Sequence, residues 1–280
     1  MSQIQQSYRY TFPPYPIGWF QVAYSSELEK GQVMPLEYFG QDLVLYRTDE
    51  GEAVVLDAFC PHLGAHMGYG GMVEGSSIRC PFHHWRFDCT GACDEIPYTD
   101  REVPKKAVMK AWTVREVNGL IMVWHHPDGA EPHFELPVVT EYGDDAWTFP
   151  YKTRRWKIRT RNQEMAENSV DTAHFKYLHG THNLPEASIE PNGPHLHVVS
   201  ETVTKAGGNL VPGQIIVDLH GFGFTTTRFV GIVETLLVNS VTPIDEDYVD
   251  VRFSFMVKKF GGRDVTEGIG KAYIAEIERQ

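Results

Sequence analysis

Two short segments, Cys60-Pro61-His62 and Cys80-Pro81-Phe82-His83, constrain this 280-residue chain more than any other feature. Each segment offers one cysteine and one histidine, and residues 63–79 separate them. Thiolates and imidazoles are the ligands that zinc and iron–sulfur centres prefer in proteins. The first half of the chain is therefore expected to fold so that two tight loops face each other around a metal centre.

The mixed composition of each segment distinguishes two kinds of centre. In zinc fingers, like ligands usually pair along the chain, as Cys-x-x-Cys and His-x₃₋₅-His. A Rieske [2Fe–2S] cluster instead has one iron held by two cysteines and the other by two histidines. We therefore expect Cys60, His62, Cys80 and His83 to hold a Rieske cluster, with zinc as the alternative. The remaining cysteines, Cys89 and Cys93, are expected to lie outside the ligand set.

A second group of polar residues follows in the second half of the chain. Asp171 and His174 are three residues apart and share one face of a helix. His174 and His179 are five apart, about 140° around a regular helix, so the helix must distort or end near His179. Gly180 permits such an end. The alternatives are a capping role for His179 and competition from His182.

The two groups together indicate a reaction type. A Rieske cluster donates single electrons, and two histidines with a carboxylate suit a mononuclear Fe(II) that activates O₂. We therefore expect a mononuclear iron held by His174 and His179.

Hydrophobic patterns divide the chain into two parts. Asp42–Thr48 with Ala53–Phe59 reads as one hairpin, and Trp112–Glu116 with Leu120–Trp124 flanks the turn Asn118-Gly119. The first part is therefore predicted to be an antiparallel β domain. Pro127-Asp128-Gly129 punctuates the chain after it.

The second part mixes helices with strands. Lys152–Arg161 reads as a strand, and Gln163–His179 reads as a helix. Three or four strands are expected between Gln214 and Phe260, and Tyr248–Val257 alternates most clearly. Val265–Gln280 reads as a final helix. The basic side of the first strand carries Arg155, Lys157, Arg159 and Arg161, which suits either a solvated, ion-paired face or a reductase-docking face.

With these motifs in place, the chain resembles the Rieske non-haem iron oxygenases over nearly its full length. The resemblance implies an α+β fold, with an antiparallel β Rieske domain followed by a helix-grip catalytic domain. It divides the chain into an arm at 1–17, a Rieske domain at 18–127 and a catalytic domain at 128–280. The final carboxylate ligand of the family would lie just past Gln280, so the catalytic domain is expected to be incomplete at its C-terminus.

The resemblance also implies roles for single residues. Asp171 matches the bridging aspartate of the family, which joins an iron-ligand histidine to a cluster-ligand histidine of a neighbouring subunit. By that match His83 would release the electron and His174 would receive it. The family forms head-to-tail homotrimers, because the two metal centres of one subunit are too far apart for electron transfer.

Weaker motifs point to a subgroup. Thr90–Tyr98, Glu167–Phe175 and Asn239–Pro243 look like segments of 3-ketosteroid 9α-hydroxylase oxygenases and related sterol-oxidising enzymes. The expected activity is thus a monooxygenase that hydroxylates a steroid or another hydrophobic polycyclic substrate. The alternative is a Rieske electron-transfer or assembly protein with an inactive second iron site.

Composition limits the partners and the location. The net charge of −12 argues against nucleic acid, because phosphate binding needs a basic surface. The absence of a long apolar run and of a signal-peptide pattern predicts a cytoplasmic protein with no membrane span. Since no glycine-rich dinucleotide fingerprint occurs, electrons are expected from a separate NAD(P)H-dependent ferredoxin reductase.

Overall fold

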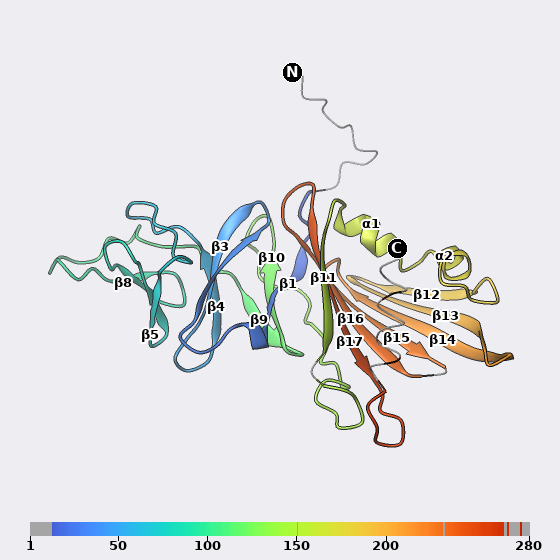
Figure 1. Cartoon of the computed structure of the whole chain (residues 1–280). Coiled ribbons are helices and arrows are strands. Elements are labelled where there is room, and N and C mark those ends of the chain that lie inside the picture. Colours follow the sequence, from blue (N-terminus) through green and yellow to red (C-terminus); the bar gives the residue numbers. More distant parts are fainter. Residues whose placement is uncertain (1–12, 150, 232, 266–267, 269–274, 276–280) are drawn as a thin grey trace.

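The structure, a computed structural model, describes residues 13–149, 151–231, 233–265, 268 and 275 (Figure 1). Over these residues the strands form three small antiparallel sheets and one seven-stranded antiparallel sheet. The small sheets have the strand orders β1-β10-β9, β2-β3-β4 and β5-β6-β7-β8. Their elements are β1 (Gly18–Tyr24), the 3₁₀ helix η1 (Ser25–Glu27), β2 (Val33–Tyr38), β3 (Gln41–Arg47), β4 (Ala53–Asp57), β5 (Met72–Glu74), β6 (Ser77–Arg79), β7 (Arg86–Phe87), β8 (Cys93–Glu95), β9 (Val114–Val117) and β10 (Leu120–His125).

Both hairpins predicted in this part are present. β3 pairs with β4, and β9 pairs with β10. The turn between β9 and β10 has φ of +55° at Asn118 and +72° at Gly119. Two consecutive residues with positive φ make the kind of turn that matches the twist of a β-ribbon, and Asn-Gly adopts it at little cost.

The seven-stranded sheet has the order β11-β17-β16-β15-β14-β13-β12. Two short helices follow its first strand and lie over one of its faces (Figure 1). The elements are β11 (Lys152–Ile158), α1 (Asn162–Glu167), α2 (Thr172–Tyr177), β12 (Ala187–Asn192), β13 (His195–Ala206), β14 (Asn209–His220), β15 (Phe224–Val230), β16 (Thr235–Pro243) and β17 (Val249–Val257). The predicted α+β class, a β domain followed by a domain that mixes sheet and helix, is confirmed.

The two faces of this sheet have different partners because side chains alternate along a strand. On β16, Leu236 and Val238 pack against Trp19 of β1 in one hydrophobic core. The alternate residues Leu237 and Asn239 line a pocket on the opposite face. The sheet therefore forms a wall between the first part of the chain and the pocket.

The prediction of one continuous helix over Gln163–His179 is wrong. The structure has α1 and α2, separated by Asn168–Asp171. Asp171 has an extended backbone and its carboxylate accepts a hydrogen bond from the backbone N–H of Ala173, so it begins a new helix as its N-cap.

Three further differences concern strand and helix limits. β11 ends at Ile158, so the predicted strand is three residues too long, and Arg161 instead occupies the N-cap position of α1 without a capping hydrogen bond from its side chain. The hairpin of β12 and β13 was not predicted. Four strands, β14 to β17, cover the predicted region between Gln214 and Phe260. The predicted final helix, Val265–Gln280, lies almost wholly outside the described residues.

Candidate metal centres and pocket

Two loops with the same backbone pattern carry the first ligand group. In the loop after β4, the N–H of Cys60 donates to the carbonyl of Ala65 at 2.9 Å, and the N–H of Gly64 donates to the carbonyl of Cys60 at 2.9 Å. In the loop after β6, the N–H of Cys80 donates to the carbonyl of Trp85 at 2.8 Å, and the N–H of His84 donates to the carbonyl of Cys80 at 3.1 Å. The two loops thus repeat one turn around their cysteines.

The fourth position after each cysteine completes this repeat. Gly64 has a φ of +75°, and His84, at the equivalent position, has a φ of +60°. Glycine adopts this conformation freely, whereas histidine does so at a cost. The loop after β6 therefore holds a strained residue directly after His83.

The side chains of these loops gather in like pairs. The thiols of Cys60 and Cys80 are buried and lie within hydrogen-bonding distance of each other. The rings of His62 and His83 lie 4.7 Å apart, centroid to centroid. Burial raises the pKa of the Cys60 thiol to about 11, a cost that binding to a metal would offset because the metal takes the thiolate.

This arrangement discriminates between the two candidate centres. Among the described residues, no three His, Cys, Asp or Glu side chains converge on a position that one metal ion could fill. A tetrahedral zinc would need all four ligands at one point. A cysteine pair beside a histidine pair instead fits a centre with two irons.

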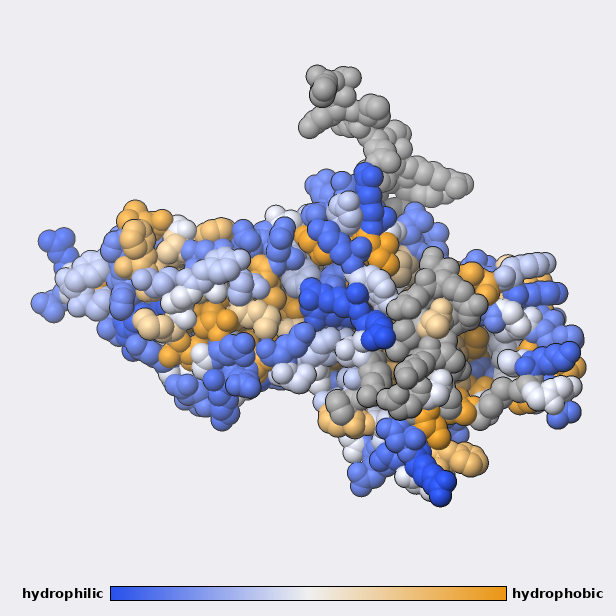
Figure 2. All heavy atoms as spheres, viewed as in Figure 1, coloured by the Kyte–Doolittle hydropathy of each residue, from blue (hydrophilic) through white to orange (hydrophobic). Residues whose placement is uncertain are grey.

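Aromatic side chains surround the histidine pair. The ring of Trp85 stacks on His62, with centroids 4.4 Å apart and planes 6° apart. The indole N–H of Trp85 donates to the hydroxyl of Tyr98 at 2.6 Å. On the outer side, Leu63 and Phe82 expose 64% and 61% of their surface, and hydrophobic residues are visible at this end of an otherwise mostly polar face (Figure 2). Cys93 is buried and Cys89 exposed.

The end of α2 sets the position of the second histidine pair. α2 ends at Tyr177, and the N–H groups of Leu178 and His179 both donate to the carbonyl of His174, at 2.8 and 3.3 Å. Gly180 then turns the chain with a φ of +70°. This is the helix end that the sequence predicts, and it brings the rings of His174 and His179 to 5.2 Å, centroid to centroid.

The orientation of His174 is fixed by a backbone group. Its Nδ1 atom contacts the carbonyl oxygen of Asp171. A carbonyl can only accept, so Nδ1 carries the proton and Nε2 keeps its lone pair. Burial lowers the pKa of His174 and so favours the neutral ring, although this hydrogen bond acts in the opposite direction.

Asp171 contacts His174 through its backbone, and its carboxylate lies farther from the ring. Its Oδ2 atom lies 4.0 Å from Nδ1 of His174, and 57% of its side chain is exposed. Within this chain, the backbone carbonyl of Asp171 contacts the ring, while the carboxylate caps α2. His182 is not among the residues that line the pocket beside this pair, and its backbone N–H donates to the carbonyl of Val203.

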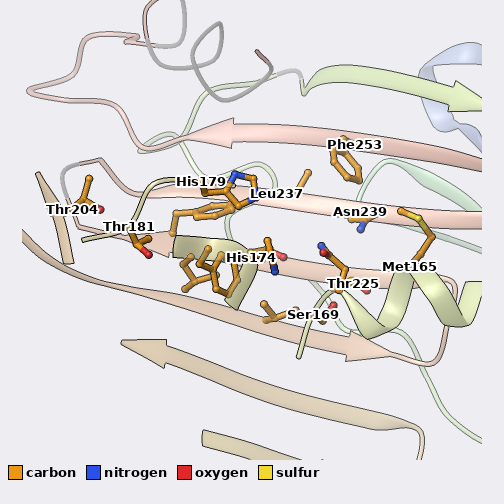
Figure 3. Close-up of a pocket in the computed structure, with 16 residues that line it drawn as sticks. Met165, Ser169, His174, His179, Thr181, Thr204, Thr225, Leu237, Asn239 and Phe253 are labelled. Atoms are coloured by element: carbon orange, nitrogen blue, oxygen red, sulfur yellow. The ribbon is translucent and has the colours of Figure 1, made fainter. Parts of the chain in front are cut away.

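Both histidines open into a pocket between α1, α2 and the large sheet (Figure 3). The cavity has a volume of about 290 Å³. Its lining combines apolar side chains with hydroxyl, amide and imidazole groups. The lining residues are Met165, Asn168, Ser169, His174, Phe175, His179, Thr181, Thr204, Ile215, Val217, Thr225, Thr227, Phe229, Leu237, Asn239 and Phe253.

The sequence motifs did not predict most of this pocket. Only the two histidines were expected, and the sheet residues come from β14 to β17, whose register no local pattern specifies. Of the carboxylates near the predicted final helix, Asp264 lies within the described residues, whereas Glu267, Glu276 and Glu278 lie outside them.

Comparison with known proteins agrees with this architecture. Residues 18–117 match the Rieske [2Fe-2S] domain family, and residues 123–280 match the 3-ketosteroid 9alpha-hydroxylase C-terminal domain family. The oxygenase component of a 3-ketosteroid-9-alpha-monooxygenase from Rhodococcus rhodochrous is 31% identical over 287 residues, covering 93% of this chain and 75% of that protein. The chain belongs to the Rieske oxygenase family. The predicted [2Fe–2S] domain of this Rieske oxygenase is thereby confirmed.

Other relatives of this Rieske oxygenase are sterol enzymes. A cholesterol 7-desaturase from Ciona intestinalis is 39% identical over 177 residues, which is 63% of this chain and 37% of that protein. A second, from Bombyx mori, is 41% identical and is covered over 40% of its length. The chain therefore spans about two fifths of the cholesterol 7-desaturases that it matches.

Solved structures share the fold of this Rieske oxygenase. Dicamba monooxygenase with non-heme iron and dicamba superposes with a TM-score of 0.72 at 18% identity, covering 89% of this chain and 79% of that one. NdmA of Pseudomonas putida CBB5 with caffeine gives 0.74 at 20% identity, with 93% and 78% covered. No helix among the described residues is long and apolar enough to cross a bilayer.

Proposed function

We propose that this chain is the oxygenase component of a Rieske non-haem iron monooxygenase that hydroxylates a steroid-like substrate. The observation that carries the proposal is the histidine pair, His174 and His179, which opens into a pocket with both apolar and hydrogen-bonding side chains, in a chain that also has a Rieske domain. The steroid class is supported by the relatives, which are named for 3-ketosteroids and cholesterol.

We propose Cys60, His62, Cys80 and His83 as the cluster ligands and His174 and His179 as ligands of the mononuclear iron. When bound, the cluster would supply single electrons and Fe(II) would supply O₂ activation. The paired thiols and paired rings of the two loops fit the first group. The free Nε2 of His174, set by the Asp171 carbonyl, fits the second.

The proposed iron site needs a carboxylate besides the two histidines. His174 and His179 supply two of the three positions of a facial triad, and a carboxylate would supply the third together with negative charge. The domains proposed for these two sites are residues 18–127 and 128–280, after an arm at 1–17.

Electron delivery is proposed to run between copies of the chain in a homotrimer. Figure 1 places the β5–β8 sheet, beside the cluster loops, and α2, beside His174, at opposite ends of the molecule. Transfer within one chain would have to cross that length. In the proposed route, His83 of one copy meets Asp171 of the next, and the exposed carboxylate of Asp171 is accessible for such a contact.

The proposed electron source is a separate NAD(P)H-dependent ferredoxin reductase, and the proposed location is the cytoplasm, where four free thiols remain reduced. Of the four basic residues Arg155, Lys157, Arg159 and Arg161, Arg155 forms an ion pair with Asp250 at 2.7 Å, and Lys157 lies over the ring of Tyr248. These contacts favour the ion-paired role of this strand.

The test combines metal analysis with product analysis. Purified protein should contain iron and acid-labile sulfide and show the low-g EPR signal of a reduced Rieske centre, whereas zinc alone would contradict the cluster. With a reductase, NADH, O₂ and a steroid panel, the expected product is a hydroxysteroid. A desaturated product would correct the reaction type. Cluster reduction without oxidation of any steroid would contradict the proposed activity.

A further inference from the structure

The carboxamide oxygen of Asn239 lacks a hydrogen-bond partner among the described residues. This atom, Oδ1, is buried. The side chain projects from β16 into the pocket, near Phe253 and Met165 (Figure 3). Nearly all buried polar groups in proteins are hydrogen-bonded, and an unpaired one destabilises the fold. An unpaired polar group at this position therefore points to a role in binding rather than in folding.

Other asparagines of this chain show what a structural role would require. Asn162 is buried, and its Nδ2 donates to the carbonyls of Val241 and Phe222 at 2.7 and 3.1 Å. Asn118 accepts from the N–H of Val139 at 2.8 Å and donates to the carbonyl of Pro137 at 2.9 Å. These side chains connect backbone segments, whereas Asn239 has no such contact among the described residues.

The neighbours of Asn239 explain why it is unpaired. Its cross-strand partners are Thr225 on β15 and Phe253 on β17. Phe253 offers no hydrogen-bonding group. The next residue, Ser240, faces the other side of the sheet and donates to Oε1 of Gln21. Thr225 carries a hydroxyl and lines the cavity together with Asn239, but it makes no hydrogen bond to Oδ1 of Asn239.

The position of Asn239 along the pocket is also distinctive. On β15, the lining residues Phe229, Thr227 and Thr225 mark successive positions along the strand, about 13 Å from first to last at 3.3 Å per residue. Asn239 pairs with the last of these. In Figure 3 the histidine pair lies between Thr181 and Thr204 at one end of the pocket and Asn239 at the other.

We propose that Asn239 is the residue that anchors the substrate, by hydrogen-bonding an oxygen substituent at one end of a rigid, otherwise apolar molecule. A carboxamide both donates and accepts, so a hydroxyl or a keto oxygen would pair with it. The hydrocarbon part would then lie along the apolar wall past His174 and His179. The choice of a fused-ring ligand rests on the proposed function, while the hydrogen bond rests on the unpaired carboxamide.

The experiment compares binding of matched steroids without turnover. The metal-loaded protein, kept anaerobic, is titrated with a steroid hydrocarbon and with derivatives that carry one hydroxyl or one keto group at C3 or at C17. Asn239→Leu removes both hydrogen-bonding atoms at similar volume. Asn209→Leu, at an exposed asparagine of β14 that does not line the pocket, is the matched control. Asn239→Ala gives the same comparison if the leucine variant fails to fold.

For the steroid whose oxygen reaches Asn239, the Asn239→Leu substitution should weaken binding at least tenfold. The affinity for the steroid hydrocarbon should change by no more than about twofold. Asn209→Leu should leave this discrimination intact. Because an unpaired buried group is removed, the thermal midpoint of ligand-free Asn239→Leu should equal or exceed that of the wild type. Equal weakening for both steroids, or unchanged discrimination, would overturn the anchor.

The same titration separates this inference from the proposed reaction. Selective binding that depends on Asn239, with no product when reductase and O₂ are added, would contradict the monooxygenase and support the anchor. Product formation, with discrimination unchanged in Asn239→Leu, would support the monooxygenase and contradict the anchor. A lower midpoint for the ligand-free variant, without altered discrimination, would assign Asn239 to the fold.

Discussion

At the scale of a single residue, Asp171 contributes separately to the start of α2 and to the orientation of His174. Its carboxylate accepts from the N–H of Ala173 at 3.0 Å and so caps α2, while its carbonyl holds the ring of His174. The side chain is more than half exposed, which leaves one side of the carboxylate open to another molecule. The capping function needs only an acceptor, whereas a bridge to a protonated imidazole of a neighbouring subunit needs the charge.

Substitution can separate these contributions. Asp171→Asn should keep the cap and change the free energy of unfolding by less than about 0.5 kcal/mol, whereas Asp171→Ala should lose about 1 kcal/mol. Both variants should slow electron transfer out of the cluster without lowering cluster content. Single-turnover oxidation of the reduced cluster measures the transfer, and denaturant unfolding measures the cap. A wild-type transfer rate in Asp171→Asn would show that the charge has no part in it.

The sequence predicted the cluster loops at this scale because their ligands are close along the chain. Cys60 with His62, and Cys80 with His83, each lie within one turn, so local spacing determines their geometry. The strained conformation of His84 was not predicted, because histidine gives no sign of a positive φ that the neighbouring fold imposes. The equivalence of His84 with Gly64 appears only when the backbone hydrogen bonds are compared.

At the scale of elements, the end of α2 is the critical feature. Gly180 has a φ of +70° and no atom within 4 Å of the place that a Cβ would occupy. A substitution there would therefore strain the backbone without creating a clash. That strain would act on His179, the residue directly before it.

Gly180→Ala should lower the free energy of unfolding by about 1 kcal/mol and weaken Fe(II) binding by the chain. Gly193→Ala is the matched control, since Gly193 also has a positive φ, +58°, with no atom near its Cβ position, and it lies in the turn between β12 and β13. The control should show a similar loss of stability with unchanged iron affinity. Iron titration and denaturant unfolding check both. Equal iron affinity in the two variants would mean that Gly180 has no role in placing His179.

Elements were predicted where turn chemistry and alternation agree, and missed where they conflict. Asn118-Gly119 determines its hairpin, and the side chains of β17 alternate as expected, with Val249 and Val251 packed against Trp156 on one side. The break before α2 was missed because hydrophobic spacing continues through Asn168–Asp171, although Asn, Ser and Asp there are weak helix formers. The strand β12 was missed because Pro191 lies within it; it is an edge strand, where proline is tolerated.

At the scale of the whole molecule, a buried polar network joins the two parts of the chain. The hydroxyl of Tyr38 on β2 donates to Asp250 on β17 at 2.6 Å, and Arg252 donates to the same carboxylate at 3.0 Å. Arg155 donates to the other carboxylate oxygen at 2.7 Å. Burial would raise the pKa of Asp250, but the hydrogen bonds from Arg155 and Tyr38 and the charge of Arg252 outweigh it, and the pKa is lowered.

Asp250→Asn should destabilise the protein by about 3–5 kcal/mol at neutral pH, because among the described residues it leaves the buried charge of Arg252 with only its longer ionic contact to Glu27, at 3.4 Å. Since the pKa of Asp250 is lowered in the folded state, its contribution is present above its ordinary pKa of 3.8 and is lost as the pH falls through the lower folded value. The difference between wild type and variant should therefore shrink in acid.

Denaturant unfolding across a pH series measures this difference. Glu135→Gln, which breaks the exposed pair of Glu135 with Arg115 at 2.9 Å, should cost no more than about 1 kcal/mol and serves as the control. A difference between wild type and Asp250→Asn that stays constant down to pH 3 would show that the carboxylate charge is not what stabilises the junction.

The pocket is the part of the site that sequence reasoning could not reach, and the reason lies at this scale. His174 and His179 come from one local motif, whereas Ile215, Thr225 and Asn239 meet only through the register of three strands. Alternation shows that two faces exist, but which face meets the first part of the chain depends on the docking of β1 against β16.

The same alternation gives the sheet an evolutionary property. Along β16, the odd positions Leu237 and Asn239 face the pocket, while the even positions Leu236, Val238 and Ser240 face the partner domain. Substitutions at odd positions can therefore alter substrate preference without disturbing the junction between domains. A single inserted residue would exchange the two sets at once. Descendants of this chain are thus expected to diversify by point substitution on alternate residues, with strand length held constant.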